Sequence, residues 1–297
     1  MATESQPVTV LGGTGYLGRQ IVAALLDARY PVRVASRHAD QASLPEGVEA
    51  FRCDITDKKQ VREAVSGAFA VVNAVSLYHE RGSATFDQIH VQGAAQVAQE
   101  ASRARAGRLV LISGIGANER SASAYVRARG AGERMSWQYF LGATVLRPSV
   151  LFDQTGGFVA NLEQLTRAPV VPLFGRGRTR LQPAHVADVA RAVVRVIERD
   201  RGEHPVYELG GQSYAFRDCV KMDLAYRRRR RLLVPVPFLV WHAMAAVLGR
   251  LPEPPLTRDQ VILMKSDNLV AEGCPSFDDL DISPRDLASV LERPAQG

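Results

Sequence analysis

Short apolar, β-branched runs alternate with longer amphipathic stretches along the first half of this chain. The short runs predict strands, and the stretches with apolar residues at helical spacing predict helices. The predicted strands are residues 8–11, 31–36, 48–53, 69–75, 108–113 and 143–148. The predicted helices are residues 15–28, 58–65, 86–103 and 123–135. Strands and helices that alternate in this order build a parallel sheet from βαβ units.

The regular alternation ends after Pro148. Proline and glycine become frequent there, and one further predicted helix, residues 186–199, is followed by segments of mixed pattern. We therefore expect an α/β fold. Residues 1–150 should form a Rossmann domain, a doubly wound parallel sheet with helices on both faces, and residues 151–297 a smaller mixed α/β lobe. The boundary near Val150 is approximate, because the second lobe of such proteins is often interleaved with the first.

Composition places the chain among ordinary globular proteins. Its 297 residues are 46% hydrophobic and 23% charged, so wholesale disorder is not expected. The cysteines, Cys53, Cys219 and Cys274, are far apart and form no CxxC pair, which argues against a disulfide framework and fits a reducing compartment. The histidines lack metal-ligand spacing, so no metal site is expected. Residues 1–7 show no secretory signal pattern.

A glycine-rich turn lies between the first predicted strand and the first predicted helix. Gly12, Gly15 and Gly18 have the GxxGxxG spacing of a dinucleotide-binding turn. Glycine permits the tight turn and lets backbone N–H groups approach a pyrophosphate at the positive end of the helix. The residues expected to hold the dinucleotide here are Gly12, Gly13, Thr14, Gly15, Tyr16, Leu17 and Gly18.

The end of the second strand indicates which dinucleotide is bound. A site for NAD usually carries an acidic residue there, which bonds the ribose 2′-hydroxyl. This chain instead has Ser36 and Arg37, which could bond a 2′-phosphate, so NADP(H) is favoured over NAD(H). The alternative is that Arg37 is an ordinary surface residue. Asp54 and Ile55, after the third strand, are expected near the adenine.

Further cofactor contacts are expected where the fourth and fifth strands end. Ala74 and Val75 should line the path of the cofactor. The fifth strand ends at Ser113, which is followed by Tyr125 and, four residues later, by Arg129. Tyr125 and Arg129 are one helical turn apart and share a face of the predicted helix.

This arrangement resembles the active site of the short-chain dehydrogenase/reductase superfamily, extended or atypical branch, in which a serine precedes a Tyr-x-x-x-Lys motif. The resemblance implies that Ser113, Tyr125 and Arg129 contact the cofactor, and that Tyr125 is the acid or base of hydride chemistry at a carbonyl. Arginine stands here in place of lysine. A guanidinium keeps the charge but cannot lose a proton, so a relay through the amine is closed. These residues are therefore either catalytic or only cofactor contacts.

The second half is similar to one subgroup of this superfamily. The similar blocks are residues 144–152, which include Pro148 on the expected nicotinamide side, and residues 169–183, 186–190, 207–211, 232–238 and 255–261. The subgroup contains the nucleotide-binding accessory subunit of respiratory complex I and its bacterial relatives. The resemblance implies a tightly held NADPH with a structural or regulatory role, peripheral to the inner membrane on the cytoplasmic side in bacteria or on the equivalent matrix face.

A run of positive charge precedes an uncharged stretch. The net charge is +6, and the run consists of Arg227, Arg228, Arg229, Arg230 and Arg231. The eighteen residues from Leu232 to Gly249 contain no Asp, Glu, Lys or Arg, but two prolines interrupt the start of any spanning helix. We expect a segment that contacts a membrane surface or an acidic partner, and no nucleic acid. The alternative is a buried helix with arginines at its exposed end.

Three functions therefore remain open. The first is a cofactor-binding accessory protein of complex I with little turnover. The second is an active reductase, dehydrogenase or epimerase that acts on a small or lipophilic carbonyl or sugar substrate. The third is a regulatory sensor of the NADPH pool, whose partner binding depends on the cofactor.

Overall fold

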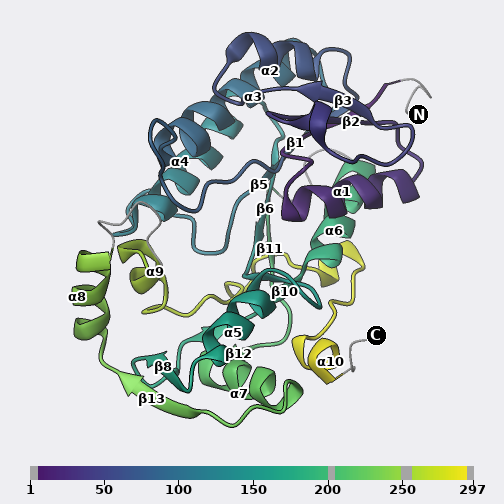
Figure 1. The fold of residues 1–297 in the computed structure, drawn as a ribbon. Coiled ribbons are helices and arrows are strands. Elements are labelled where there is room, and N and C mark those ends of the chain that lie inside the picture. Colours follow the sequence, from purple (N-terminus) through teal and green to yellow (C-terminus); the bar gives the residue numbers. More distant parts are fainter. Residues whose placement is uncertain (1–5, 200–204, 249–255, 293–297) are drawn as a thin grey trace.

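Seven parallel strands form the central sheet of the computed structural model, which describes residues 6–199, 205–248 and 256–292 (Figure 1). The strands lie in the order β11-β6-β5-β4-β1-β2-β3, and every pairing between them is parallel. They are β1 (Val8–Leu11), β2 (Val32–Ser36), β3 (Glu49–Arg52), β4 (Ala70–Asn73), β5 (Arg108–Ile112), β6 (Thr144–Pro148) and β11 (Val206–Leu209). The order reverses between β1 and β4, and ligands of such sheets bind beyond the carboxyl ends of the strands at that point.

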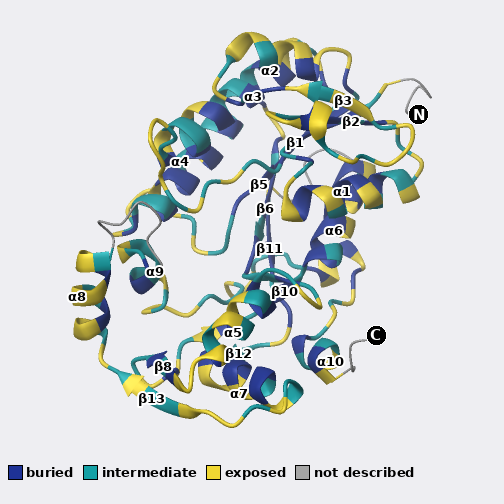
Figure 2. Cartoon of the chain, in the orientation of Figure 1, coloured by how far each residue is buried: buried dark blue, intermediate teal, exposed yellow. Residues whose placement is uncertain are grey.

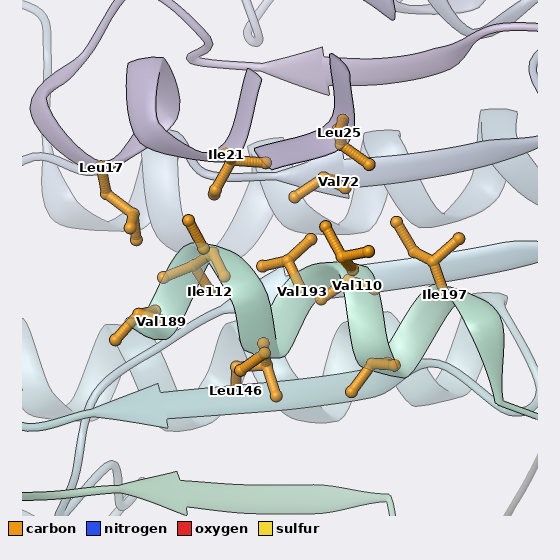
Figure 3. Packing of buried hydrophobic residues seen from close by; sticks show 14 of the residues in the cluster. Leu17, Ile21, Leu25, Val72, Val110, Ile112, Leu146, Val189, Val193 and Ile197 are labelled. Carbon is orange, nitrogen blue, oxygen red and sulfur yellow. The ribbon is translucent and has the colours of Figure 1, made fainter. Parts of the chain in front are cut away.

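Helices cover both faces of this sheet. One face carries α1 (Tyr16–Asp27) and α6 (Val186–Glu198), and the other carries α2 (Lys58–Val65), α3 (Gly93–Arg103) and α4 (Ala124–Tyr139) (Figure 1). Apolar residues of α1 and α6 pack together over β4, β5 and β6, as Figure 3 shows for Ile21 of α1 and Val193 of α6. The inner sides of the helices are buried and their outer sides exposed (Figure 2). The predicted doubly wound fold is confirmed.

The predicted helix at residues 86–103 has an unexpected beginning. Residues Asp87–Gln92 form a π-helical segment, η2, and the α-helix α3 starts only at Gly93. The wide turn lies where α4 comes very close, since a Cβ atom on Gly132 would stand 2.0 Å from the carbonyl oxygen of His90. Hydrophobic spacing does not distinguish a π-helical turn from an α-helical one, so the sequence pattern predicted one continuous helix.

Part of the chain beyond residue 150 returns to the sheet. The strand β11 pairs with β6, and α6 shares a core with α1. The sheet thus contains strands from both sides of residue 150. The division into two lobes near this residue stays a prediction. Two short 3-10 helices, η1 (Ala39–Gln41) and η3 (Asp278–Leu280), also pack against the core of the sheet half of the molecule.

The remaining elements form the smaller half of the molecule. Its helices are α5 (Phe158–Arg167), α7 (Phe216–Tyr226), α8 (Phe238–Leu248), α9 (Arg258–Leu263) and α10 (Leu287–Glu292). Its strands pair two by two: β7 (Leu151–Phe152) with β10 (Ala184–His185), β9 (Arg180–Leu181) with β12 (Tyr214–Ala215), and β8 (Val170–Phe174) with β13 (Leu232–Val236). A separate apolar core lies among α5, α7 and α10.

The uncharged stretch after the arginines divides into β13 and α8, while its last residue, Gly249, lies outside the described residues. Only Trp241 and Ala245 of α8 are buried, so α8 is not a buried core helix. Its exposed large apolar residues are Leu239, Val240, Met244 and Val247. None of the helices in the described ranges is both long and apolar enough to cross a membrane. Contact of this segment with a membrane surface stays a prediction.

Candidate functional site

A cavity of about 1140 Å³ lies beyond the carboxyl ends of the sheet strands. Its wall contains residues from the glycine turn, from the ends of β2 to β6, and from α4, α5 and α9. The predicted site residues that line it are Gly12, Thr14, Gly15, Tyr16, Leu17, Gly18, Ser36, Arg37, Asp54, Ile55, Ala74, Val75, Ser113, Tyr125, Arg129 and Pro148. The structure thus gathers residues that the sequence spreads over more than a hundred positions.

The glycine turn is held close beneath the end of β4. Gly12 has a φ of +79°, and a Cβ atom there would lie 3.0 Å from the carbonyl carbon and oxygen of Ala74. A Cβ atom on Gly18 would lie 2.1 Å from the carbonyl oxygen of Gly12. A side chain at Gly12 would push the turn away from the end of β4, and one at Gly18 would push α1 away from the turn, so both glycines are required by the local packing.

Gly13 has a different environment from its neighbours. It does not line the cavity, and a Cβ atom on it would lie 3.0 Å from both methyl groups of Val34 on β2. The structure therefore places this predicted cofactor-binding residue in the packing between the turn and the sheet.

The first turn of α1 offers free backbone donors to the cavity. Gly15 occupies its N-cap position, where it provides no side-chain hydrogen bond, and the first turn contains no acidic residue. By contrast, Asp57 caps α2 and Ser123 caps α4 through their side chains. Uncapped N–H groups at the positive end of a helix suit an anionic group such as a pyrophosphate.

At the end of β2, two polar side chains line the cavity. The hydroxyl oxygen of Ser36 is buried and has no hydrogen-bond partner in the described structure. The side chain of Arg37 is exposed, and within the described residues it makes no ion pair. Asp54, nearby on the same edge, accepts hydrogen bonds from the backbone and hydroxyl groups of Thr56 through one carboxylate oxygen. These groups fit the adenosine end of a dinucleotide.

Arg129 is buried beside Tyr125, and its guanidinium is fixed from several sides. One Nη atom donates to the carbonyl oxygen of Ile112 at 2.9 Å, and the other donates to the hydroxyl of Ser76 at 2.7 Å. The guanidinium carbon lies 5.1 Å from the centre of the Tyr125 ring, which is cation–π range. The Nε atom is buried without a partner in the described structure. The charge therefore rests against the ring face of Tyr125.

The neighbours of Tyr125 are aromatic. Tyr78 stacks on it with the ring centres 6.0 Å apart, and His90 meets it edge to face at 5.6 Å. Burial, and next the charge of Arg129, lower the pKa of His90 to about 3, so this imidazole is neutral at physiological pH. Its Nε2 atom lies 2.9 Å from the carbonyl oxygen of Leu77. The buried hydroxyl of Ser113 has no partner in the described structure.

The far wall of the cavity was missed in the sequence. It is formed by Tyr78 and by residues from α5, α9 and the segment that follows, namely Phe158, Asn161, Gln260, Leu263 and Asn268. The hydroxyl of Ser123, at the start of α4, donates to the carboxylate of Asp259 and so attaches α9 beside Tyr125. The only sequence signal for this wall was the similarity of residues 255–261 to the subgroup, which named no site residue.

Comparison with known proteins indicates the family to which this chain is related. A family model described as the NAD dependent epimerase/dehydratase family matches residues 8–210. The mitochondrial NADH dehydrogenase (ubiquinone) 1 alpha subcomplex subunit 9 of Mus musculus is 25% identical over 304 residues, covering 94% of this chain and 77% of the mouse protein. A ceramide reductase of Caulobacter vibrioides is 30% identical over 200 residues, covering 65% of this chain and 62% of that protein.

Solved structures share the fold. An NADPH-dependent quinone oxidoreductase from Escherichia coli, complexed with NADPH, superposes with a TM-score of 0.77 at 17% identity. The superposition covers 96% of this chain and 98% of that one. The family match and the cavity geometry together support a site for a nicotinamide dinucleotide, NAD(P), at the glycine turn.

Proposed function

This chain belongs to the NAD dependent epimerase/dehydratase family, and we propose that it is an NADP(H)-binding accessory subunit of respiratory complex I or of a bacterial counterpart. Its role is structural or regulatory, and its turnover is slow. The observation that carries the proposal is the buried guanidinium of Arg129, where the superfamily motif has lysine. The likeness to the mouse NADH dehydrogenase subunit along nearly the whole chain supports the assembly.

Slow turnover follows from how Arg129 is held. In the superfamily motif the cation assists a tyrosine that exchanges a proton with the substrate. Here Arg129 donates to Ile112 and Ser76 and keeps its proton, so it fixes the floor of the site without relaying a proton. When bound, NADPH would supply hydride. The residues of this chain would bind the cofactor and shield it from water.

The preference for NADP(H) is part of the proposal. The exposed guanidinium of Arg37 and the hydroxyl of Ser36, both without a side-chain partner among the described residues, stand at the strand end where a ribose 2′ group lies in this fold. A 2′-phosphate would gain charge-assisted hydrogen bonds from both. A ribose 2′-hydroxyl would gain less, because neither residue is a carboxylate.

The decisive experiment is to purify the protein gently, identify the bound nucleotide by mass, and follow the protein through membrane solubilisation beside complex I. We expect NADP(H) at close to one per chain and co-migration with the complex. Arg129→Lys should keep the nucleotide and raise the oxidation rate of bound NADPH by carbonyl compounds. NAD(H) as the bound nucleotide, or migration apart from complex I, would refute the respective part of the proposal.

A second candidate is an active reductase that acts on a lipophilic carbonyl compound. The observation in its favour is that Tyr125 and Ser113 both line the cavity, so a proton donor is present. The partial likeness to a ceramide reductase is consistent with such a substrate. In that case, Tyr125→Phe abolishes substrate-dependent oxidation of NADPH and leaves the bound nucleotide in place. Unchanged oxidation of NADPH in Tyr125→Phe would exclude the reductase function.

Contact with a membrane surface is the last part of the proposal. The exposed apolar side of α8 supplies Leu239 and Val247, and Arg228 and Arg230 are exposed before β13. Other arginines of the run are engaged, since Arg227 pairs with Asp223. Flotation with vesicles of phosphatidylcholine and phosphatidylglycerol should recover the protein. Leu239→Glu should lower the recovery severalfold, and Leu141→Glu, the same change on an exposed loop, should not.

A further inference from the structure

We infer that the far half of the cavity binds a second ligand, an uncharged and elongated apolar molecule with a carbonyl or hydroxyl group at one end. The inference rests on the proposed dinucleotide site, because it concerns the space beside that site. Ligand pockets commonly measure about 300–1,000 Å³. The cavity here is about 1140 Å³, and the residues assigned to the dinucleotide come from the glycine turn, the strand ends and α4, whereas α5 and α9 line the cavity without contributing any of them.

The far wall combines apolar surface with neutral amides. Leu263 and Phe158 contribute aliphatic and aromatic surface, and Tyr78 adds a ring stacked on Tyr125. Two of these amide side chains already accept hydrogen bonds through their oxygen atoms. The side-chain oxygen of Gln260 accepts from the backbone of Thr257 at 2.9 Å within the capping box of α9. The side-chain oxygen of Asn268 is 2.5 Å from the hydroxyl of Ser149.

Fully charged side chains are scarce around this space. Among the described residues that line the cavity, those with a full charge are Arg37, Asp54 and Arg129. The first two lie at the ends of β2 and β3, at the adenosine end. Arg129 is occupied by Ile112 and Ser76. A phosphate or carboxylate placed between α5 and α9 would lose its hydration and gain no cation, which is costly.

The lining therefore disfavours a nucleoside diphosphate sugar and favours a neutral, lipophilic compound. Tyr125 is the hydrogen-bonding group at the inner end, next to the nicotinamide position, so the carbonyl or hydroxyl end of the ligand points there. The chain of the ligand then runs toward Leu263 and Phe158. The hydrogen bond between Ser123 and Asp259 fixes α9, and with it Leu263, relative to Tyr125.

The test measures binding to protein loaded with NADPH, through calorimetry and the fluorescence of the bound nucleotide. The probes are methyl nonyl ketone, methyl propyl ketone and UDP-glucose. Each buried methylene should tighten binding about fourfold. The nonyl ketone has about six more methylenes than the propyl ketone, so it should bind at least about a hundredfold more tightly even if only a little over half of them are buried. UDP-glucose should bind more weakly than the nonyl ketone.

Two matched variants locate the site. Leu263→Glu introduces a carboxylate into the far wall and should weaken the nonyl ketone about tenfold or more, with the bound NADPH retained. Leu141→Glu makes the same change at a residue that is 92% exposed and outside the cavity, and it should bind like the wild type. Equal affinity for the two ketones, tighter binding of UDP-glucose, or an inert Leu263→Glu would overturn the inference.

The outcome for the nucleotide separates this inference from the proposed function. If the protein binds NADPH but has the same affinity for both ketones, only the inference of a second ligand is contradicted. Protein that holds no dinucleotide contradicts the proposed function itself.

Discussion

The two walls of the cavity are built in different ways. The sheet wall uses backbone: the glycine turn packs so closely that only hydrogen fits at Gly18, and α1 presents uncapped N–H groups. The opposite wall uses side chains from separate segments, such as Tyr78, Phe158 and Leu263. Backbone recognition depends on chain geometry and suits a group common to all dinucleotides. Side-chain recognition can vary without disturbing the sheet, so we expect the far wall to decide which second ligand is bound.

Gly18→Ala should break the sheet wall and has the largest expected effect. The added methyl would stand 2.1 Å from the carbonyl oxygen of Gly12, so the turn and α1 must separate. We expect loss of NADPH binding by about a hundredfold or more and destabilisation by about 2 kcal/mol, measured by calorimetry and denaturant unfolding. Gly47→Ala is the control: its φ is +80° with open space around it, so it should cost about 1 kcal/mol and keep the nucleotide. Equal nucleotide affinity in both variants would contradict the close-packing argument.

Arg37→Ala tests the one charged side chain that we assign to dinucleotide choice on the sheet wall. Removing charge-assisted hydrogen bonds to a 2′-phosphate should weaken NADPH about 10- to 100-fold and leave NADH unchanged. Competition binding with both nucleotides measures this. Arg176→Ala, at another exposed arginine outside the cavity lining, is the matched control. A parallel loss for both nucleotides would mean that Arg37 does not read the 2′ group.

His90, behind Tyr125, predicts a dependence of stability on pH. Its pKa is lowered in the folded protein to about 3, so below pH 6.5 the unfolded chain binds a proton that the folded chain does not. The free energy of unfolding should therefore fall as the pH falls, by about 2 kcal/mol between pH 6.5 and pH 5. His90→Gln should flatten this part of the profile in urea unfolding. His242→Gln, on α8, should keep the wild-type slope, and an unchanged slope in His90→Gln would contradict the assignment.

Ser123→Ala should have the smallest effect, and it tests whether the far wall can be loosened without changing the sheet wall. It removes the hydroxyl that caps α4 and holds Asp259, so α9 gains freedom beside Tyr125. We expect the affinity for methyl nonyl ketone to fall about threefold to tenfold, a loss of about 1 kcal/mol, and NADPH binding to stay. A loss of NADPH instead would show that the two walls are not independent.

The sequence predicted the sheet wall well, because its signals are local. A strand, a glycine turn and a helix in direct succession carry their own spacing, and the ends of later strands follow from the parallel topology. The residues that line the far wall have no such spacing: Tyr78 and Leu263 are far apart in the sequence and line the same cavity only through tertiary packing. The π-helical segment η2 packs against Gly132 of α4, and residues 232–236 form a strand through pairing with β8; both are tertiary contacts that local sequence spacing does not reveal.

The last sheet strand, β11, comes from residues 206–209, and α6 precedes it. While the chain emerges from the ribosome, the edge of β6 must wait for more than fifty further residues before β11 covers it, and the apolar side of α1 must wait for more than 150 before α6 does. A nascent chain that stops near residue 150 would present an open strand edge to its neighbours. This topology makes premature termination a route to aggregation, and it makes a chaperone that shields the unfinished sheet useful during synthesis.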